Sequence, residues 1–465
     1  MVPRMPDVDP DIVVVSNRGP LSFSRNDAGE LETKRGAGGL VSTLGPGVAE
    51  RGATWIAAAI TDEDREAAQQ GIIEAEGFRL RSVVIDADEY RMFYDVVSNA
   101  TLWFLHHGLF DLPRRPRIDR RWREAWDAYR SVNDAFAAVV CEEAPEDAVV
   151  LVQDYHFSLL GERLANARPD LRAVHFHHTP FCEPWALRTL PDHVAEELMR
   201  GLAGFRACGF HSNRWAGCYE AGVHAQLGEP ARTFVAPAAA DHLDIEKVAA
   251  SEECAHEMAA LEEAVGDRHL IVRVDRIELS KNLLRGFLAF DDMLRARPDL
   301  VGRVVFGAFI YPSREGLPEY MAYRQEVEGL AARLNQRWAR EGWTPILLDT
   351  SDEFPRSVAA LRRYDVLLVN PIRDGLNLVA KEGALLNERD GVIALSREAG
   401  AWEELREGAL EINPFDVAGT CESLVEAIEM EPEERGRRAQ LLKRAAARRT
   451  PTDWLHDQLR AAGAL

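Results

Sequence analysis

The segment "NPIRDGLNLVAKEG", residues 370–383, places charged and glycine residues where an apolar run, 364–369, meets a segment with helical periodicity. The first amides of a helix carry partial positive charge and lack partners within the helix, so a diphosphate is a natural ligand there. Asp374, ahead of the helix, can accept hydrogen bonds from sugar hydroxyls. Glu382 lies about 12 Å further along, a reach similar to that from a sugar to the ribose of a nucleotide sugar. The alternative is a solvated, charged helix start.

A second charged cluster, "VDRIELSKN", follows another apolar, strand-like run. Arg276 and Lys281 supply two positive charges at the end of that strand, and charge-assisted bonds to phosphate oxygens need such a pair. The alternative is a surface ion pair with Asp275 or Glu278. The phosphate-binding interpretation is strengthened because the cluster belongs to the same half of the chain as Asp374.

The third cluster combines "VSNRGP" (15–20) with the glycine-rich "KRGAGGLVSTLG" (34–45). Arg18 ends the first predicted strand, where it could hold a phosphate or form a structural salt bridge. Three glycines allow the second segment to approach a ligand closely: Gly36, Gly38 and Gly39. The segment is neither a dinucleotide fingerprint, because Val41 replaces the last glycine, nor a P-loop, because no Gly-Lys-Ser/Thr follows.

The histidines of "VQDYH" and "HFHHTPF" suggest a metal site, but their spacing does not support one. Strand alternation sends His175 and His177 to the same face and leaves His178 beyond the strand end. No third ligand with a known spacing follows. Asp154 and His178, each ending a strand, are better interpreted as groups that line a cleft.

Strand-like runs alternate with helical patterns such as 122–140 and 317–339, which predicts parallel sheets covered on both faces. The predicted strands are 11–17, 148–156, 171–178, 207–213, 269–275, 302–309, 344–350, 364–370, 391–396 and 410–414. A polar stretch between the two strand-rich halves predicts a linker near 237–245. Two doubly wound domains of this kind bind ligands at the carboxyl ends of their strands.

The composition is that of an ordinary globular protein, with 465 residues, 46% hydrophobic and 28% charged. The formal net charge of −21 disfavours nucleic acid and anionic membranes as partners. The six cysteines form no C-x-x-C pair, so we expect neither zinc nor a disulfide framework, and a reducing cytoplasm fits. The N-terminus has no signal-peptide pattern, and no apolar run is long enough to span a membrane.

In order and spacing, these motifs resemble the retaining trehalose-6-phosphate synthases, the GT-B glycosyltransferases of family 20. The resemblance includes the actinobacterial type that uses GDP-glucose. It covers nearly the whole chain and is carried by "SNR" (16–18), "GAGGL" (36–40), "SNATLW" (98–103), "QDYH" (153–156), "HTPF" (178–181), "DRIELSKN" (275–282), "YPSREG" (311–316), "GWTP" (342–345) and "RDGLNLVAKE" (373–382).

The resemblance implies an α/β, GT-B fold in which two Rossmann-like, doubly wound parallel-sheet domains face each other across a cleft. Residues 1–240 would form the acceptor domain for glucose 6-phosphate. Residues 241–448 would form the nucleotide-sugar donor domain, and a terminal helix within 449–465 would pack back on the first domain. We expect no fused phosphatase domain, because the sequence ends just after the second domain.

The resemblance also assigns roles to individual residues. The residues implied to bind the donor are Arg276, Lys281, Asp374, Gly375, Leu376, Asn377, Leu378, Val379 and Glu382. The residues implied to act in catalysis are Asp154, His178, Arg276, Lys281 and Asp374. The acceptor site would be lined by Arg18, Gly38, Gly39, Tyr94, Trp103 and Arg314.

The family transfers glucose with retention and without a metal or another cofactor. Positive side chains and helix amides would stabilise the leaving diphosphate. We favour front-face attack in which the departing phosphate oxygen takes the acceptor proton. The expected partners are small molecules, a nucleotide-glucose and glucose 6-phosphate, with no nucleic acid and no membrane. The sequence does not determine the oligomeric state, so a homo-oligomer is one of the possible states.

The segment expected to contact the donor base, "DTSDEF" (349–354), carries three acids. A guanine edge offers two kinds of N–H donor that a carboxylate can accept, whereas uracil offers one. The sequence therefore favours GDP-glucose, with Asp349, Asp352 or Glu353 as candidate readers. UDP-glucose is the alternative, in which these acids are exposed loop residues.

The sequence departs from the family pattern at "PAAAD" (237–241), where Pro-x-Gly-x-Asp is usual. Two other functions fit the same fold. One is a pseudo-glycosyltransferase that couples a cyclitol nucleotide to a phosphorylated amino-cyclitol, and the other is a non-catalytic sugar-phosphate sensor. The intact "SNR" and "RDGLNLVAKE" segments argue against the first, and the retained charged residues argue against the second.

Overall fold

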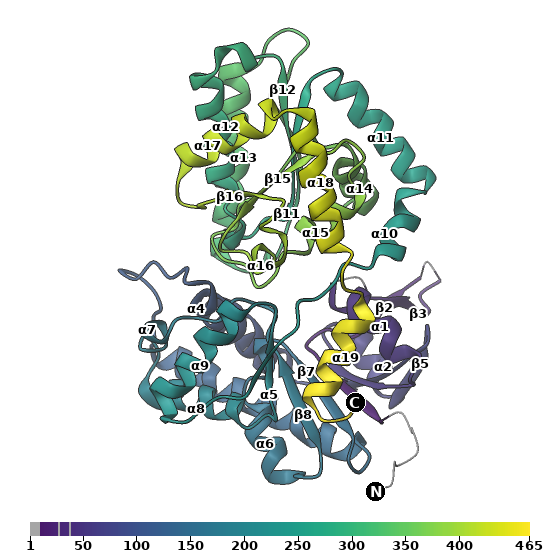
Figure 1. Ribbon diagram of the computed structural model, residues 1–465. Helices are drawn as coiled ribbons and strands as arrows, with labels where there is room; N and C mark the ends of the chain where they lie inside the picture. Colours follow the sequence, from purple (N-terminus) through teal and green to yellow (C-terminus); the bar gives the residue numbers. More distant parts are fainter. Residues whose placement is uncertain (1–9, 27, 37–38) are drawn as a thin grey trace, which may run out of the picture. The chain divides into compact units, whose positions relative to one another are not determined.

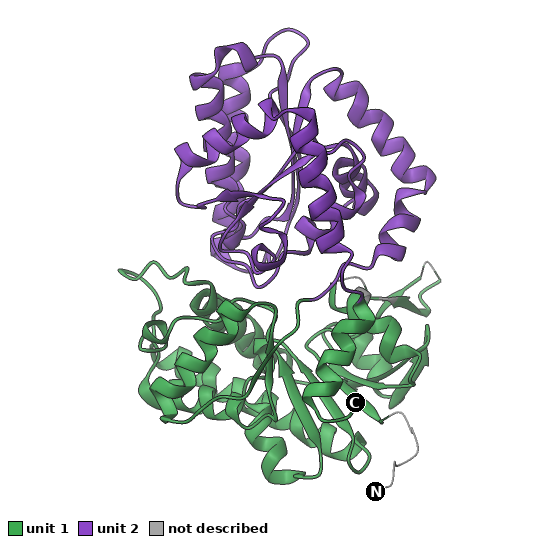
Figure 2. Ribbon diagram, viewed as in Figure 1, with its two compact units in different colours: residues 1–237, 451–465 green, residues 238–450 purple. Residues whose placement is uncertain are grey.

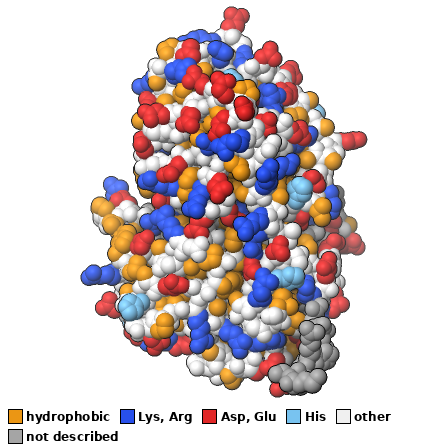
Figure 3. All heavy atoms as spheres, in the orientation of Figure 1, with side chains coloured by type: hydrophobic (Ala, Val, Ile, Leu, Met, Phe, Trp, Pro, Cys, Tyr) orange, Lys and Arg blue, Asp and Glu red, His pale blue; other side chains and the backbone are white. Residues whose placement is uncertain are grey.

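The computed structural model describes residues 10–26, 28–36 and 39–465. The chain forms two compact units (Figure 2). The first contains the residues up to Pro237 together with the C-terminal segment Pro451–Leu465, and the second is Ala238–Thr450. The linker expected near 237–245 begins at this division. Acidic and basic side chains are interspersed over the face drawn in Figure 3, so opposite charges are mixed on it despite the net charge of −21.

The first unit is built on an eight-stranded sheet in the order β10-β9-β8-β7-β1-β4-β6-β5. All neighbouring pairs are parallel except β5 and β6. The strands are β1 Ile12–Val15, β4 Thr54–Ala58, β5 Ile72–Ala75, β6 Phe78–Val83, β7 Val149–Gln153, β8 Arg172–Phe176, β9 Cys208–Phe210 and β10 Thr233–Val235. Beside it, β2 Leu21–Arg25 and β3 Leu31–Arg35 form an antiparallel pair.

Helices of the first unit connect and cover these strands (Figure 1). They are α1 Gly39–Ala49, α2 Asp62–Ala68, α3 Ala87–Arg91, the π-helix η1 Met92–Trp103, α4 Phe104–His107, α5 Arg120–Glu143, the 3₁₀ turn η2 Tyr155–Phe157, α6 Leu160–Ala167, α7 Pro184–Leu187, α8 Asp192–Ala203, α9 Asn213–Leu227 and α19 Pro451–Ala461. The last of these, α19, comes from the end of the chain and packs against α1 and β8.

The second unit has a six-stranded, fully parallel sheet in the order β13-β12-β11-β14-β15-β16. The strands are β11 His269–Arg276, β12 Val304–Tyr311, β13 Ile346–Asp349, β14 Val366–Val369, β15 Val392–Ser396 and β16 Leu410–Ile412. All four residues of β14 and all five of β15 are buried, as expected for strands covered on both faces.

Helices lie on both faces of this second sheet, with α12, α13 and α17 on one side and α10, α11 and α14 on the other (Figure 1). The elements are α10 His242–Ala249, α11 Glu252–Val265, η3 Leu279–Lys281, α12 Leu283–Ala296, η4 Pro298–Leu300, α13 Pro318–Trp338, α14 Phe354–Arg363, α15 Leu378–Leu386, α16 Trp402–Leu405, α17 Val417–Glu429 and α18 Pro432–Ala446. None of the described helices is both long and apolar enough to cross a bilayer.

The α/β architecture with two parallel-sheet domains is therefore confirmed. Each of the ten predicted strand runs overlaps a strand, and the two helical patterns correspond to α5 and α13. The sequence interpretation missed β4, β6 and β10 of the first sheet, together with the antiparallel β5 and the pair β2 and β3.

Asn377 shapes the start of α15. Its backbone is left-handed, with φ 82° and ψ 88°. Its side-chain oxygen accepts a hydrogen bond from the amide of Ala380 at 3.1 Å, and its amide nitrogen donates to Asp374 Oδ2 at 3.1 Å. One side chain thus caps the helix and connects it to the preceding loop.

We predict that Asn377→Ala lowers the free energy of unfolding by about 1–2 kcal/mol, because it removes the cap and leaves a side chain in a left-handed conformation. Asn377→Gly relaxes the backbone and should cost less than Asn377→Ala. Urea denaturation of both variants measures the difference. Equal losses would contradict the conformational part of this explanation.

Candidate active site

The order of the strands creates one divergence point in each sheet. In the second unit β11 and β14 are neighbours, yet the chain proceeds from β11 towards β12 and from β14 towards β15, on opposite sides. In the first unit β1 and β7 are neighbours and diverge in the same way. Loops that leave such a pair of strands spread apart and leave room for a ligand at the carboxyl ends.

Lys281 and Asp374 meet at the divergence point of the second unit. Lys281 Nζ lies 2.7 Å from Asp374 Oδ2 and 3.5 Å from Asp275 Oδ1. The amide of Ile372 donates to the carbonyl of Ser280 at 2.7 Å, which joins the two loops directly. Burial alone would lower the pKa of Lys281, but the two carboxylates raise it above its usual value, so the ammonium stays charged.

Arg276 ends β11 beside Glu278, which it shares with a second arginine. Glu278 Oε1 lies 3.2 Å from Arg276 Nη1 and 2.9 Å from Arg314 Nη1. The ion pair with Glu278 that the sequence left open is thus present. The side chain of Arg276 nevertheless stays 48% exposed, so the pairing leaves its guanidinium accessible.

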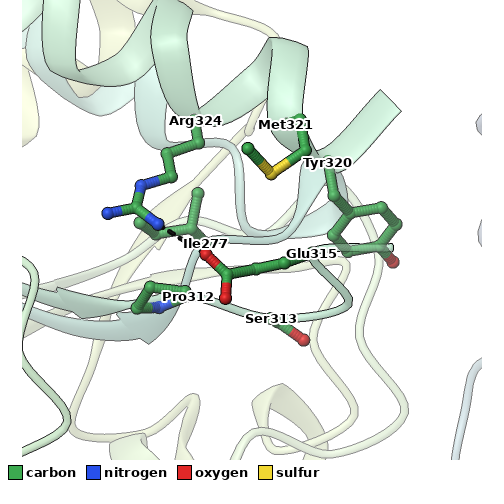
Figure 4. Close-up of a pocket in the computed structure, with 7 residues that line it drawn as sticks. All are labelled: Ile277, Pro312, Ser313, Glu315, Tyr320, Met321 and Arg324. Atoms are coloured by element: carbon green, nitrogen blue, oxygen red, sulfur yellow. Dashed lines mark hydrogen bonds and ion pairs between the residues drawn. The ribbon is translucent and has the colours of Figure 1, made fainter. Parts of the chain in front are cut away.

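Arg314 is held on its other side by Tyr320, whose hydroxyl accepts a hydrogen bond from Arg314 Nη1 at 2.8 Å. Next to it lies a shallow surface hollow, where Glu315 and Arg324 pair at 2.6 Å (Figure 4). The residues that line it are Ile277, Pro312, Ser313, Glu315, Tyr320, Met321 and Arg324. None of these seven is among the residues predicted to bind substrates.

Arg273 is a buried support that the sequence interpretation missed. It is 0% exposed and donates to Asp275 Oδ2 at 3.1 Å, to Asn370 Oδ1 at 2.6 Å and to the carbonyl of Lys281. It therefore connects the end of β11 to the end of β14. An arginine inside the apolar run of a buried strand was the signal that could have found it.

The loop before α15 is fixed by the turn that follows β15. The amide of Gly400 donates to the carbonyl of Asp374 at 3.1 Å, and the amide of Ala401 donates to Leu376 at 2.8 Å. A Cβ at Gly400 would stand 1.9 Å from the carbonyl oxygen of Gly375, so only glycine permits this approach. Leu378 and Val379 begin the helix, where amides have no intrahelical acceptor.

Lys381 and Glu382 are adjacent, but their surroundings indicate different roles. Lys381 is buried, where its Nζ donates to the carbonyl of Ala238 at 2.7 Å and pairs with Glu404 at 2.5 Å. Lys381 thus ties α15 to the first residue of the second unit and is structural. Burial raises the pKa of Glu382 to about 7.

In the first unit, Asp154 and His178 are brought together. Asp154 follows β7 with a φ of 70°, and its Oδ1 accepts hydrogen bonds from the amides of Tyr155 at 3.0 Å and His178 at 3.3 Å. Burial lowers the pKa of His178 to about 4, so its imidazole is neutral at pH 7. Arg18 follows β1, the neighbour of β7, and is exposed.

The predicted acceptor residues of the first unit have different surroundings. Tyr94 stacks on Tyr90 at 5.6 Å between ring centroids, and Tyr90 accepts a hydrogen bond from Asn17, the neighbour of Arg18. Trp103 is only 2% exposed and stacks on His107, so the structure gives it a core position. Gly39 begins α1, while Gly38 lies outside the described residues.

The histidines show no arrangement for metal binding. Among residues 10–26, 28–36 and 39–465, no three His, Cys, Asp or Glu side chains are placed to share an ion. Burial lowers the pKa of His106 and of His175 to about 3, so both rings are neutral. They pack in an aromatic cluster with His177 and Phe181.

The three candidate readers of the base differ in their surroundings. Asp349 ends β13, accepts a hydrogen bond from the amide of Ser351 at 2.8 Å and pairs with Arg356. Burial alone would raise the pKa of Asp349, but Ser351 and Arg356 lower it below its usual value. Asp352 and Glu353 are exposed at the start of α14.

Comparison with known proteins gives this geometry its context. The model for glycosyltransferase family 20 matches residues 10–463. The chain belongs to glycosyltransferase family 20. The trehalose-6-phosphate synthase of Mycolicibacterium smegmatis is 31% identical to it over 480 residues, which cover 98% of this chain and 92% of that protein.

Two solved structures are similar over almost their full lengths. The trehalose-phosphate synthase (UDP-forming) of Burkholderia xenovorans, in complex with glucose-6-phosphate, has a TM-score of 0.84 and 27% identity, covering 97% of this chain and 100% of that one. A structure from E. coli bound with UDP-2-fluoro glucose has a TM-score of 0.86 and 25% identity, covering 98% and 99%. Family 20 membership and the GT-B fold inferred from the sequence are confirmed.

The raised pKa of Glu382 predicts a pH-dependent stability. Its ordinary value is 4.5 and its folded value about 7, so between these limits the folded protein binds the proton more tightly than the unfolded chain. The buried carboxylate therefore destabilises the fold increasingly as pH rises from 4.5 to 7, and constantly above. Glu382→Gln should raise the free energy of unfolding at pH 8 by about 1–3 kcal/mol, a gain that shrinks as pH falls through that interval.

Urea denaturation at several pH values measures this effect, and the exposed Glu407, changed to Gln, provides the control. The control variant should follow the unmodified protein at every pH. A gain for Glu382→Gln that is the same at pH 8 and pH 5 would show that ionisation is not its cause.

Proposed function

We propose that this chain synthesises trehalose 6-phosphate, with retention, from a nucleotide-glucose donor and glucose 6-phosphate. The observation that carries the proposal is the meeting of Arg276, Lys281, Asp374 and the start of α15 at one divergence point, within a member of family 20. The names of the mycobacterial relative and the Burkholderia structure support the same activity.

The donor would use the second unit. Arg276 and Lys281 bind the diphosphate, together with the amides of Leu378 and Val379 at the start of α15. Lys281 has three N–H donors, so its bond to Asp374 leaves others for a phosphate oxygen. Asp374 accepts hydrogen bonds from glucose hydroxyls, with Gly375, Leu376 and Asn377 alongside, and Glu382 accepts from the ribose.

The acceptor would use Arg18, which binds the phosphate of glucose 6-phosphate with Arg314. Gly38, Gly39, Tyr94 and Trp103 are the remaining acceptor residues in this proposal. Asp154 and His178 bind the hydroxyls of the glucose that is transferred. Binding the acceptor by its phosphate and the transferred glucose by its hydroxyls orients the attacking hydroxyl, which reduces the entropic part of the barrier.

The reaction breaks the bond between the glucose C1 and the diphosphate oxygen and forms a bond from C1 to the acceptor hydroxyl on the same face. The departing phosphate oxygen takes the hydroxyl proton, so charge and protons balance. Arg276, Lys281 and the helix amides stabilise the negative charge that develops on the leaving diphosphate. We propose that this set of donors acts without a metal ion.

For the base, we propose guanine, which makes GDP-glucose the favoured donor. Asp349 is engaged by Ser351 and Arg356, so Asp352 and Glu353 are the carboxylates that stay accessible to accept from the N1–H and N2–H₂ groups. One of the two similar structures is of a UDP-forming enzyme and the other is bound with UDP-2-fluoro glucose, so a direct comparison of the two donors is the deciding measurement.

The activity is tested by incubating the protein with glucose 6-phosphate and either GDP-glucose or UDP-glucose at equal concentration, with and without EDTA. We expect release of the nucleotide diphosphate and formation of trehalose 6-phosphate, faster with GDP-glucose and unchanged by EDTA. No release with either donor would refute the activity. Faster turnover with UDP-glucose would refute the choice of base, and a loss with EDTA would refute metal independence.

Arg276→Ala should lower kcat/KM by about 10²–10³-fold, because it removes one charge from the leaving group. Circular dichroism should show an unchanged fold, since the side chain is half exposed. Arg303→Ala, an exposed arginine that directly precedes β12 at the amino-terminal end of the same sheet, is the matched control. Near-normal activity in Arg276→Ala would remove Arg276 from the diphosphate site.

A further inference from the structure

The last helix of the chain, α19, covers the end of β8 in the first unit (Figure 1). Trp454 is fully buried, and its ring lies edge-on to Phe176, with 4.9 Å between centroids, and 5.6 Å from His178. One helical turn later, Gln458 is also 0% exposed. A helix that returns from the far end of the sequence thus places Trp454 next to a predicted catalytic residue and buries Gln458 one turn further along.

A continuous chain of hydrogen bonds leads from Gln458 to that residue. Gln153, the last residue of β7, donates from Nε2 to Gln458 Oε1 at 3.0 Å. At its other end, Gln153 Oε1 lies 3.0 Å from Nε2 of His178. Both glutamines are buried, so water does not compete for these bonds.

The polarity of the Gln153 amide determines where the proton of His178 lies. An amide has one donor end and one acceptor end. Because the donor end of Gln153 is bound by Gln458, its carbonyl faces His178, and a carbonyl can only accept. With the amide in this orientation, Nε2 of His178 carries the proton. Burial lowers the pKa of His178 to about 4, so the neutral ring has a single N–H and its Nδ1 is an acceptor.

We propose that Gln458 is a positioning residue for His178. It orients Gln153, which holds the proton on Nε2 and leaves Nδ1 free of a proton, ready to accept a hydrogen bond from a sugar hydroxyl. The choice of a sugar hydroxyl as the ligand of Nδ1 rests on the proposed function. The position of the proton does not, because it follows from the contacts within the first unit.

In this role Gln458 acts through its side-chain oxygen, which accepts the hydrogen bond from Gln153. Two substitutions distinguish the loss of this acceptor from a change in the volume of the side chain. Gln458→Met fills a similar volume but cannot accept a hydrogen bond, so the Gln153 amide can rotate and offer its NH₂ group to His178. Gln458→Glu keeps an acceptor oxygen at the same position. Arg460→Gln, on the exposed side of α19 and paired only with the surface carboxylate Asp457 among the contacts described, is the matched control.

Nitrogen-15 solid-state NMR of histidine-labelled protein measures the tautomer, with the His178 signal assigned by its loss in His178→Gln. We expect Nε2–H for the unmodified protein, Gln458→Glu and Arg460→Gln, and a mixture with Nδ1–H for Gln458→Met. In the assay with glucose 6-phosphate and the active donor, kcat/KM should fall about five- to tenfold for Gln458→Met and recover in Gln458→Glu.

The inference fails if the unmodified protein shows Nδ1–H at His178, a result that needs no variant to fold. It also fails if a folded Gln458→Met keeps pure Nε2–H. Absence of trehalose 6-phosphate synthesis in the unmodified protein, with the expected tautomers present, would instead refute the proposed function and leave the positioning role of Gln458 intact.

Discussion

The contact between Lys281 and Asp374 is the interaction on which the second unit's ligand edge depends. Two loops 93 residues apart in sequence place an ammonium and a carboxylate 2.7 Å apart at the ends of neighbouring strands. Burying such charges is costly unless each has partners. Asp275 is a second partner of Lys281 and Asn377 a second partner of Asp374, while Arg273 holds Asp275 through a further hydrogen bond. The charge is therefore kept in place before any substrate arrives, which is the preorganisation that electrostatic catalysis requires.

The two units share one topological feature, a pair of diverging neighbouring strands, but differ in the chemistry that follows it. Each sheet has one pair of neighbouring strands from which the chain leaves in opposite directions, and each pair is followed by polar loops. In the second unit those loops carry arginine, lysine and a helix start. In the first they carry Asp154, a neutral His178 and the exposed Arg18. The first unit thus presents hydrogen-bonding groups suited to sugar hydroxyls, and the second presents positive charge suited to phosphates.

Backbone conformation contributes to both edges. Asp154, Arg314 and Asn377 all have positive φ, with values of 70°, 47° and 82°. Left-handed conformations in residues other than glycine cost free energy and persist where surrounding bonds hold them. In each of these residues the side chain is bonded to a neighbour in the same loop or helix start, so the strained backbone and the side-chain contact fix each other.

Much of the fold was determined by sequence alone. Apolar runs such as β7, β14 and β15 are buried on both faces, so consecutive residues carry the signal of their burial and each was predicted. The missed strands lack that signal: β6 alternates arginine with apolar residues, β4 is rich in alanine, and none of the three residues of β10 is buried. The charged motifs at strand ends were also visible, because parallel strands place them at one edge whatever the details of packing.

Only the tertiary structure decided which of those charges meet. Of this adjacent pair, the sequence assigned a role to Glu382 alone, whereas the structure shows that Lys381 is buried and bonded to the carbonyl of Ala238 and that Glu382 has a raised pKa. Arg273 lay hidden inside a strand, and Gln458 lay 305 residues from its partner Gln153. Local periodicity fixes which side of an element is apolar. Contacts between distant segments depend on how those elements pack, and no short stretch of sequence contains that information.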